Sequence, residues 1–124
     1  MKICISSTGK DLNAEVDQRF GRCQYFIIVD METMNVKTIL NESTLSFGGA
    51  GIQSAQIVAK EGVDSVISGN IGPNAFQILQ AAGIKVFTGA KGTINDAIES
   101  YKTGKLQETG SANVESHSGI GGRT

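Results

Sequence analysis

The sequence predicts an α/β domain in which helices cover a mixed five-stranded sheet. Two observations carry this prediction. Extended, alternating segments fill the first third of the chain, and helical and strand patterns alternate from about residue 50 onward, each helix ending at a glycine. A chain of 124 residues is about one domain long, which is enough to bury a single core.

Three strands are predicted in the first part of the chain. Residues 2–6 alternate apolar and other side chains and end in the turn-forming stretch Ser-Thr-Gly, so they read as the first strand. Residues 24–31 contain an uninterrupted apolar run, and residues 35–41 alternate in character. A short polar turn joins these two segments, which predicts an antiparallel hairpin.

Three helices and two further strands are predicted after residue 50. The first helix spans 51–61, the second starts at Pro73 and stops at Gly83, and the third starts after a Thr93 cap and stops at Gly104. The two strands span 63–68 and 84–87. Right-handed crossovers make strands joined by helices parallel, whereas the hairpins make the second strand antiparallel. The predicted sheet order is therefore 3-2-1-4-5.

The composition of the last twenty residues predicts a flexible tail. From Lys105 onward the chain is rich in glycine and serine and has almost no apolar content, so we expect residues 1–104 to form one domain and residues 105–124 a flexible tail. His117 lies in this tail. A solvated side chain is its simplest interpretation, and closure over a soft-metal site is the alternative.

Composition excludes several classes of function. The formal net charge of -1 offers no electrostatic reason to bind nucleic acid or an acidic membrane. The short apolar opening is no signal peptide and no run is long enough to span a membrane, so we expect a cytoplasmic protein whose cysteines are thiols. Because the predicted domain contains no histidine, Ser-His-Asp and Cys-His chemistry are excluded, and we expect no enzyme.

Glycine-bearing loops are predicted to meet at one edge of the sheet. The loops 46–51, 69–74 and 89–93 each lead from a strand into a helix, and the turn at 6–9 lies beside Cys23. Three helix N-termini there would offer unpaired N–H groups to an anion, and glycine would allow close approach. The simpler alternative is that these turns need glycine for their own geometry. Neither the GxGxxG nor the P-loop pattern is complete.

Cys23 is the candidate for metal or reactive chemistry. It lies in the stretch RFGRCQYFIIV, which begins at Arg19, between a glycine turn flanked by two arginines and an apolar strand. Cationic neighbours lower the pKa of a thiol, which would suit a ligand or a nucleophile, and a simple strand-entry residue is the alternative. Cys4, in the middle of an apolar strand, is expected to be a small buried hydrophobic residue.

Three motifs in order make the chain similar to a known family. The segments RFGRCQYFIIV from Arg19, GGAGIQSAQ from Gly48 and GPNAFQIL from Gly72 resemble the dinitrogenase iron-molybdenum cofactor biosynthesis family, which includes NifX, NafY and the C-terminal part of NifB. The resemblance covers residues 1–104. It implies a ribonuclease-H-like three-layer α/β/α domain that binds an iron-sulfur or molybdenum-containing cluster transiently and hands it on without catalysis.

The resemblance also implies a site and partners. Family members often carry histidine before the phenylalanine of the FGR motif, where this chain has Arg19, so Cys23 is the natural substitute as metal ligand. The expected partners are proteins that donate or accept the cluster, and the expected state is a monomer or weak homodimer. The predicted cofactor-binding residues are Arg19, Gly21, Arg22, Cys23, Gly48, Gly49, Gly51, Gly72 and Asn74.

Two other functions stay open at this point. One is a regulatory module that binds a small anion or nucleotide through the loops 48–51, 69–74 and 89–93. The other is an enzyme with Cys23 as nucleophile, which lacks a base in the predicted domain.

Overall fold

The elements of the protein follow the predicted order. A computed structural model describes residues 1–42 and 49–110. The elements are β1 (Lys2–Ser7), the short 3-10 helix η1 (Phe20–Arg22), β2 (Tyr25–Asp30), β3 (Val36–Leu40), α1 (Ala50–Lys60), β4 (Ser65–Ile67), α2 (Pro73–Ala81), β5 (Lys85–Phe87) and α3 (Ile94–Lys102). Every predicted strand and helix is confirmed to within two residues at its ends, and η1 is an addition that the sequence pattern did not predict.

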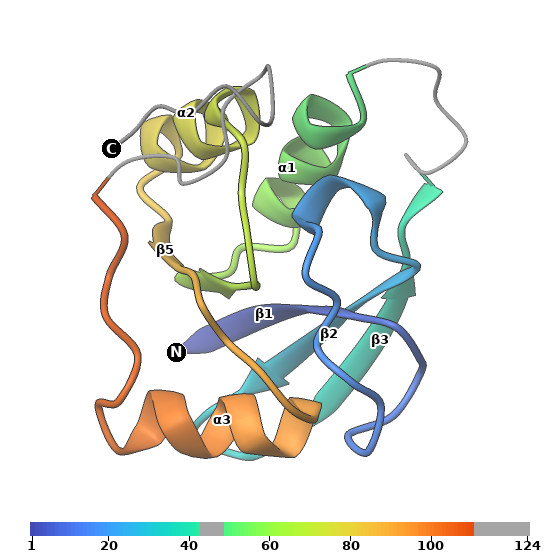
Figure 1. Cartoon of the computed structure of the whole chain (residues 1–124), viewed down its shortest axis with the longest axis vertical. Helices are drawn as coiled ribbons and strands as arrows, with labels where there is room; N and C mark the ends of the chain where they lie inside the picture. Colours follow the sequence, from blue (N-terminus) through green and yellow to red (C-terminus); the bar gives the residue numbers. More distant parts are fainter. Residues whose placement is uncertain (43–48, 111–124) are drawn as a thin grey trace.

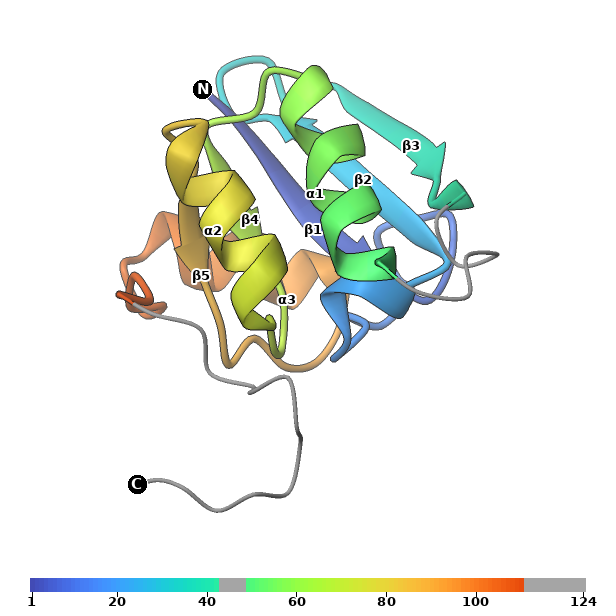
Figure 2. The ribbon, with the colours of Figure 1, turned by 90° about the horizontal axis from the view of Figure 1, so that it is seen from above.

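The sheet has the predicted order β3-β2-β1-β4-β5. β2 runs antiparallel to both β1 and β3, whereas β4 runs parallel to β1 and to β5. In Figure 1, α1 and α2 lie on one face of this sheet and α3 lies on the other, which makes three layers. Figure 2 shows α1 and α2 side by side across the strands, with their N-termini at the same end of the molecule.

The core consists of one apolar cluster on each face of the sheet. Cys4, Phe20 and Phe26 belong to the cluster beneath α1 and α2, and Ile3 and Ile27 belong to the cluster beneath α3. Successive residues of a strand point to opposite faces, so a central strand that is covered on both sides is apolar at every position. This explains the uninterrupted apolar run of β2. Cys4 is fully buried, as predicted.

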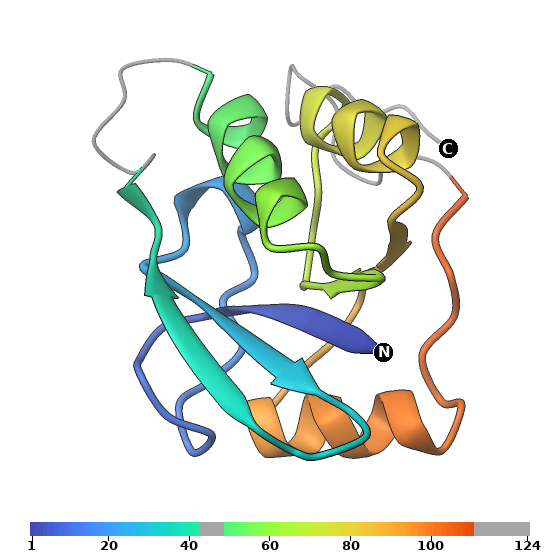
Figure 3. The same cartoon turned by 180° about the vertical axis from the view of Figure 1, so that it is seen from behind.

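The two edges of the sheet are covered unequally. The N–H of Thr109 donates to the Val86 carbonyl at 2.7 Å, and Leu106 packs against the cluster beneath α3. Thus the first residues of the predicted tail lie along β5. At the opposite edge, the residues of β3 are largely exposed, and Figure 3 shows β3 at the edge of the sheet. The mobility of residues 105–124 stays a prediction, and residues 111–124, with His117, lie outside the described residues.

The helices of the described residues are all short. The longest, α1, has 11 residues, whereas a membrane-spanning helix needs about 20. Among residues 1–42 and 49–110, therefore, no helix could cross a bilayer.

Candidate functional site: a cavity between two helix N-termini

A cavity of about 290 Å³ lies where α1 and α2 begin and η1 passes beside them. Its lining consists of Phe20, Gly21, Arg22, Gly49, Ala50, Gly51, Ile52, Gly72, Pro73, Asn74 and Ala75. The three segments that resemble the cofactor family therefore meet at one place, although about thirty residues or more separate η1 from the helices. Figure 2 shows η1 in blue beside the N-terminus of α1.

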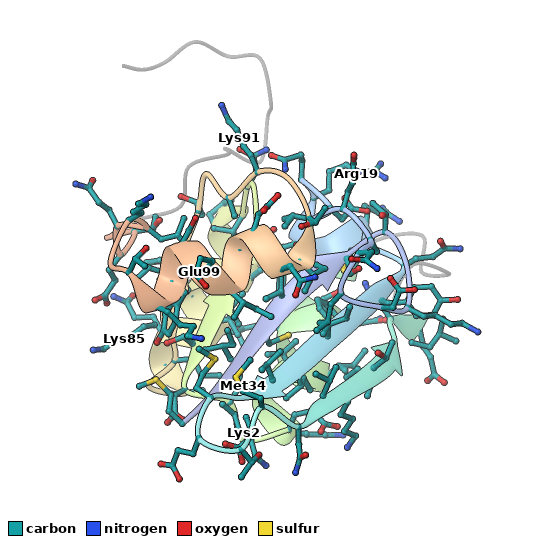
Figure 4. The ribbon with its side chains drawn as sticks, turned by 90° about the horizontal axis from the view of Figure 1, so that it is seen from below. Lys2, Arg19, Met34, Lys85, Lys91 and Glu99 are labelled. Carbon is teal, nitrogen blue, oxygen red and sulfur yellow. The ribbon has the colours of Figure 1, made fainter. Side chains whose placement is uncertain are left out.

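Most of the predicted site residues line this cavity. Those that do are Gly21, Arg22, Gly49, Gly51, Gly72 and Asn74. Arg19 does not line it. Its side chain is 70% exposed, and its Nε lies 3.7 Å from Asp17 Oδ1. Figure 4 shows Arg19 at the rim of the molecule, pointing outward. Gly48 lies outside the described residues.

Two glycines allow η1 to pack directly on the start of α1. A Cβ atom added at Gly21 would lie 2.9 Å from Gly51 Cα and 3.0 Å from Gly51 N, closer than real Cβ contacts allow. Gly49, the N-cap of α1, has a left-handed backbone with φ of 71°, a conformation that glycine adopts without steric cost. The backbones of the two motifs are thus in contact with no side chain between them.

A buried polar network fastens η1 from below. The Asn41 Nδ2 donates to the Cys23 carbonyl at 2.8 Å, and the Ser54 Oγ donates to Asn41 Oδ1 at 3.1 Å and to the Gly21 carbonyl at 3.3 Å. These bonds join η1 to the end of β3 and to α1. Sequence reasoning missed Asn41 and Ser54. The only signal was a polar residue at the end of a predicted strand and another on the apolar face of a predicted helix.

The two helices at the cavity begin without side-chain caps. Gly49 and Gly72, the N-cap residues of α1 and α2, have no side chain that could accept a hydrogen bond, whereas α3 starts with a complete capping box in which Thr93 and Asp96 satisfy each other's N–H groups. Within the described part of the chain, the first-turn N–H groups of α1 and α2 have no hydrogen-bond acceptor; these belong to Ala50, Gly51, Ile52, Asn74 and Ala75. Unpaired N–H groups and two helix dipoles therefore give this cavity a positive potential.

The third glycine loop does not reach the cavity. Gly89 and Lys91 line a separate cavity of about 250 Å³ beside α3, which packs on the other face of the sheet. This loop does meet the 69–74 loop at the carboxyl edge of the strands, as predicted, since the Gly89 N–H donates to the Gly69 carbonyl at 2.9 Å, but it lies outside the cavity between α1 and α2. The loops that follow β4 and β5 leave the sheet at the same edge, but the chain after β5 crosses to the other face of the sheet, where α3 packs.

Cys23 lies beneath the cavity and does not line it. Its side chain is fully buried, its thiol donates to the Phe20 carbonyl at 3.2 Å, and its sulfur accepts from Asn41 Nδ2 at 3.6 Å. Burial, followed by the charge of Asp17, raises the pKa of Cys23 to about 12. The expectation that the arginines lower this pKa is wrong, because loss of water around the thiolate dominates. The assignment of Cys23 as metal ligand stays a prediction.

The described residues offer no ready-made set of metal ligands. Nowhere in residues 1–42 and 49–110 do three or more His, Cys, Asp or Glu side chains gather closely enough to hold a metal ion. The residues that line the cavity offer backbone N–H groups, the Arg22 side chain and apolar surface.

Comparison with known proteins supports the motif-based resemblance. The profile of the dinitrogenase iron-molybdenum cofactor family matches residues 1–104. Among curated proteins, the uncharacterized protein MJ0580 of Methanocaldococcus jannaschii is 33% identical over 99 residues, which cover 77% of this chain and 84% of that protein.

Two solved structures have the same fold at substantial sequence identity. The apo form of the orange protein from Desulfovibrio gigas is 38% identical, with a TM-score of 0.88 over 90% of this chain and 95% of that chain. An NMR structure of a putative NifB protein from Thermotoga is 40% identical, with a TM-score of 0.77 over 86% of this chain and 91% of that chain.

The contact between η1 and α1 generates a prediction about stability. Gly21→Ala should lower the free energy of unfolding by about 1–3 kcal/mol, because the new methyl group meets the backbone of Gly51 and not a side chain that can move. Gly51→Ala is the matched control, since its Cβ would meet only Ala75 Cβ at 3.5 Å and alanine favours a helix. Urea denaturation compares the two, and equal stability for both variants would contradict the close contact.

The burial of Cys23 predicts slow thiol chemistry. At pH 8 an exposed thiol is partly ionised, whereas a thiol with a pKa near 12 is not, so iodoacetamide should modify Cys23 more than about a hundredfold faster in the unfolded chain than in the native one. Because the pKa is raised on folding, this thiol lowers the free energy of unfolding only as the pH rises above the ordinary thiol pKa of about 8.5. Peptide mapping of the alkylated cysteines measures the rate, and rapid labelling of native Cys23 would place it at the surface.

Proposed function

The chain belongs to the dinitrogenase iron-molybdenum cofactor family, and we propose that it is a non-catalytic carrier that holds an anionic metal-sulfur cluster in the cavity between η1, α1 and α2. The observation that carries this proposal is the pair of uncapped helix N-termini facing one cavity, while α3, which begins elsewhere, is fully capped. An anion there would accept hydrogen bonds from the first-turn N–H groups that have no cap to accept them.

The charge of the cavity supports an anionic ligand. Among the described residues that line the cavity, Arg22 carries the charged side chain, and none of the others is acidic. The positive ends of the α1 and α2 dipoles add to the guanidinium charge. Iron-sulfur and thiomolybdate species that carry net negative charge match this potential.

The walls support a sulfide-rich ligand rather than a small oxyanion. Phe20, Ile52 and Pro73 contribute apolar surface, and the backbones at the helix starts contribute N–H donors, so the cavity combines hydrogen-bond donors with apolar contact. Its volume lies near the lower end of small-molecule sites, which begin at about 300 Å³. Hydrogen bonds to sulfur and a partly apolar shell are the means by which proteins tune such clusters.

None of the described residues that line the cavity has a thiol, imidazole or carboxylate side chain, which supports a carrier. A cluster held without thiolate or imidazole coordination leaves no metal-protein bond to break when it passes to another protein. We therefore propose reversible, noncovalent binding and partners that donate or accept the cluster. The orange protein from Desulfovibrio gigas, which has the same fold, was solved as an apo form.

A small-anion or nucleotide module is the second candidate. The uncapped N-termini favour it as well, because they accept a phosphate as readily as a sulfide-bearing anion. The loop at 89–93 does not contribute to the cavity, however, so a nucleotide would lack one of the three loops that this function was predicted to use.

Anaerobic reconstitution tests the proposal. The purified protein is incubated with tetrathiomolybdate or, separately, with iron and sulfide, and the visible absorption of the desalted product is recorded. Asn74→Asp should reduce uptake about tenfold or more, because it places a carboxylate at the start of α2, where the anion binds. Asn95→Asp is the matched control: it adds the same charge at the start of α3, outside the cavity, and should leave uptake unchanged.

Cys23→Ser separates two modes of binding in the same assay. We expect the chromophore to persist in this variant, since Cys23 does not line the cavity. Loss of the chromophore in a folded Cys23→Ser protein would instead make Cys23 the metal ligand. A wild-type protein that retains no chromophore but binds phosphate or nucleotide would replace the carrier by the anion module.

A further inference from the structure

We propose that β3 is a self-association surface through which two copies of this chain pair edge to edge and form one continuous ten-stranded sheet. This inference is independent of the cavity and of what it binds. It begins from exposed apolar residues. Met34, Val36 and Leu40 are 43%, 43% and 56% exposed, and with Met1 they are the exposed large hydrophobic side chains of the described residues. Figure 4 shows Met34 at the same end of the molecule as Lys2.

The hydrogen-bonding groups of this edge are open. The Asp30 N–H donates to the Asn35 carbonyl, and the Asn41 N–H donates to the Gln24 carbonyl. In an antiparallel pair such bonded residues recur at every second position, so the main-chain groups of Val36, Thr38 and Leu40 point away from β2. β3 pairs with no other strand among the described residues, whereas residues 106–109 lie along β5 at the opposite edge.

The edge is complementary to itself. If two copies of β3 pair antiparallel about Thr38, Val36 of each copy lies opposite the partner's Leu40. Val36, Thr38 and Leu40 all lie on the α3 side of the sheet. The pairing therefore joins Val36 and Leu40 of the two copies, four exposed apolar side chains, in two cross-strand pairs. The hydroxyl of Thr38 already donates to the Lys10 carbonyl at 2.8 Å, which leaves its main-chain groups for the partner.

The charges of β3 permit this pairing. An exposed lysine is a common means of keeping two edge strands apart. Lys37 is the charged residue of β3, but its Nζ lies 2.9 Å from Glu61 Oε1 of α1, on the other face from Val36 and Leu40. The two-fold axis therefore brings together two neutralised ion pairs and not two free ammonium groups.

The size of the surface predicts weak association. Five residues a side is far fewer than the roughly 20–30 of a stable interface, so we expect a dissociation constant on the order of 0.1–1 mM. A protein of 13.0 kDa should then be largely monomeric when dilute and increasingly dimeric when concentrated.

Sedimentation equilibrium of the full chain tests the proposal. The weight-average mass should rise toward that of a dimer as the concentration approaches about 1 mM. Val36→Lys and Leu40→Glu should each abolish the rise, because each places a charge against an apolar partner. Both residues are exposed, so the fold should persist, as far-ultraviolet circular dichroism will verify. Gln80→Lys, an exposed position on α2, is the control and should associate like the wild type.

The double variant tests the register itself. Val36→Lys combined with Leu40→Glu should restore association, since the two introduced charges face each other across the two-fold axis. Within one chain these positions are about 13 Å apart along the strand, too far to pair. A wild type that stays monomeric up to about 1 mM, single variants that associate unchanged, or a double variant that does not recover would each overturn the proposal.

Discussion

The close contact between Gly21 and Gly51 is the constraint on which the site depends. It places the turn of η1 against the first residues of α1, with no side chain between the two backbones. Phe20, which is almost fully buried, anchors the turn in the core beside Phe26, at 5.3 Å between ring centroids. Asn41 and Ser54 then hold the Gly21 carbonyl and the Cys23 carbonyl from below. The cavity exists because these contacts keep η1 beside two helix N-termini without filling the space above them.

The two helices that begin at the cavity lack the stability that a side-chain cap would add. A serine, threonine or aspartate cap stabilises a helix by about 1 kcal/mol, and α3 uses such a cap. α1 and α2 begin instead at Gly49 and Gly72, with Pro73 as the first residue of α2. Packing on the sheet stabilises these helices in place of caps, since Ala55, Val58 and Leu79 are fully buried. Their first N–H groups are thereby left to the cavity.

The sheet order could be predicted from sequence because local patterns and chain connectivity determine it. Alternating segments, glycines at the helix ends and right-handed crossovers predicted the order β3-β2-β1-β4-β5, and the structure confirms it. The face on which α3 packs had no such signal, so the sequence could not show that the loop at 89–93 lies outside the cavity between α1 and α2. The prediction that the pKa of Cys23 is lowered was wrong for a related reason. Two arginines are its neighbours in sequence, but tertiary packing removes water from its sulfur and brings Asp17 near it.

The account's central claim is that unpaired N–H groups at two helix starts hold an anionic cluster. Amide NMR of the labelled protein during titration with tetrathiomolybdate tests this claim most directly, because it observes those groups one by one. We predict the largest shifts at Gly51, Ile52 and Ala75, with the capped start of α3 at Ile94 unaffected. Shifts centred elsewhere, or none at ligand concentrations that colour the protein, would contradict it.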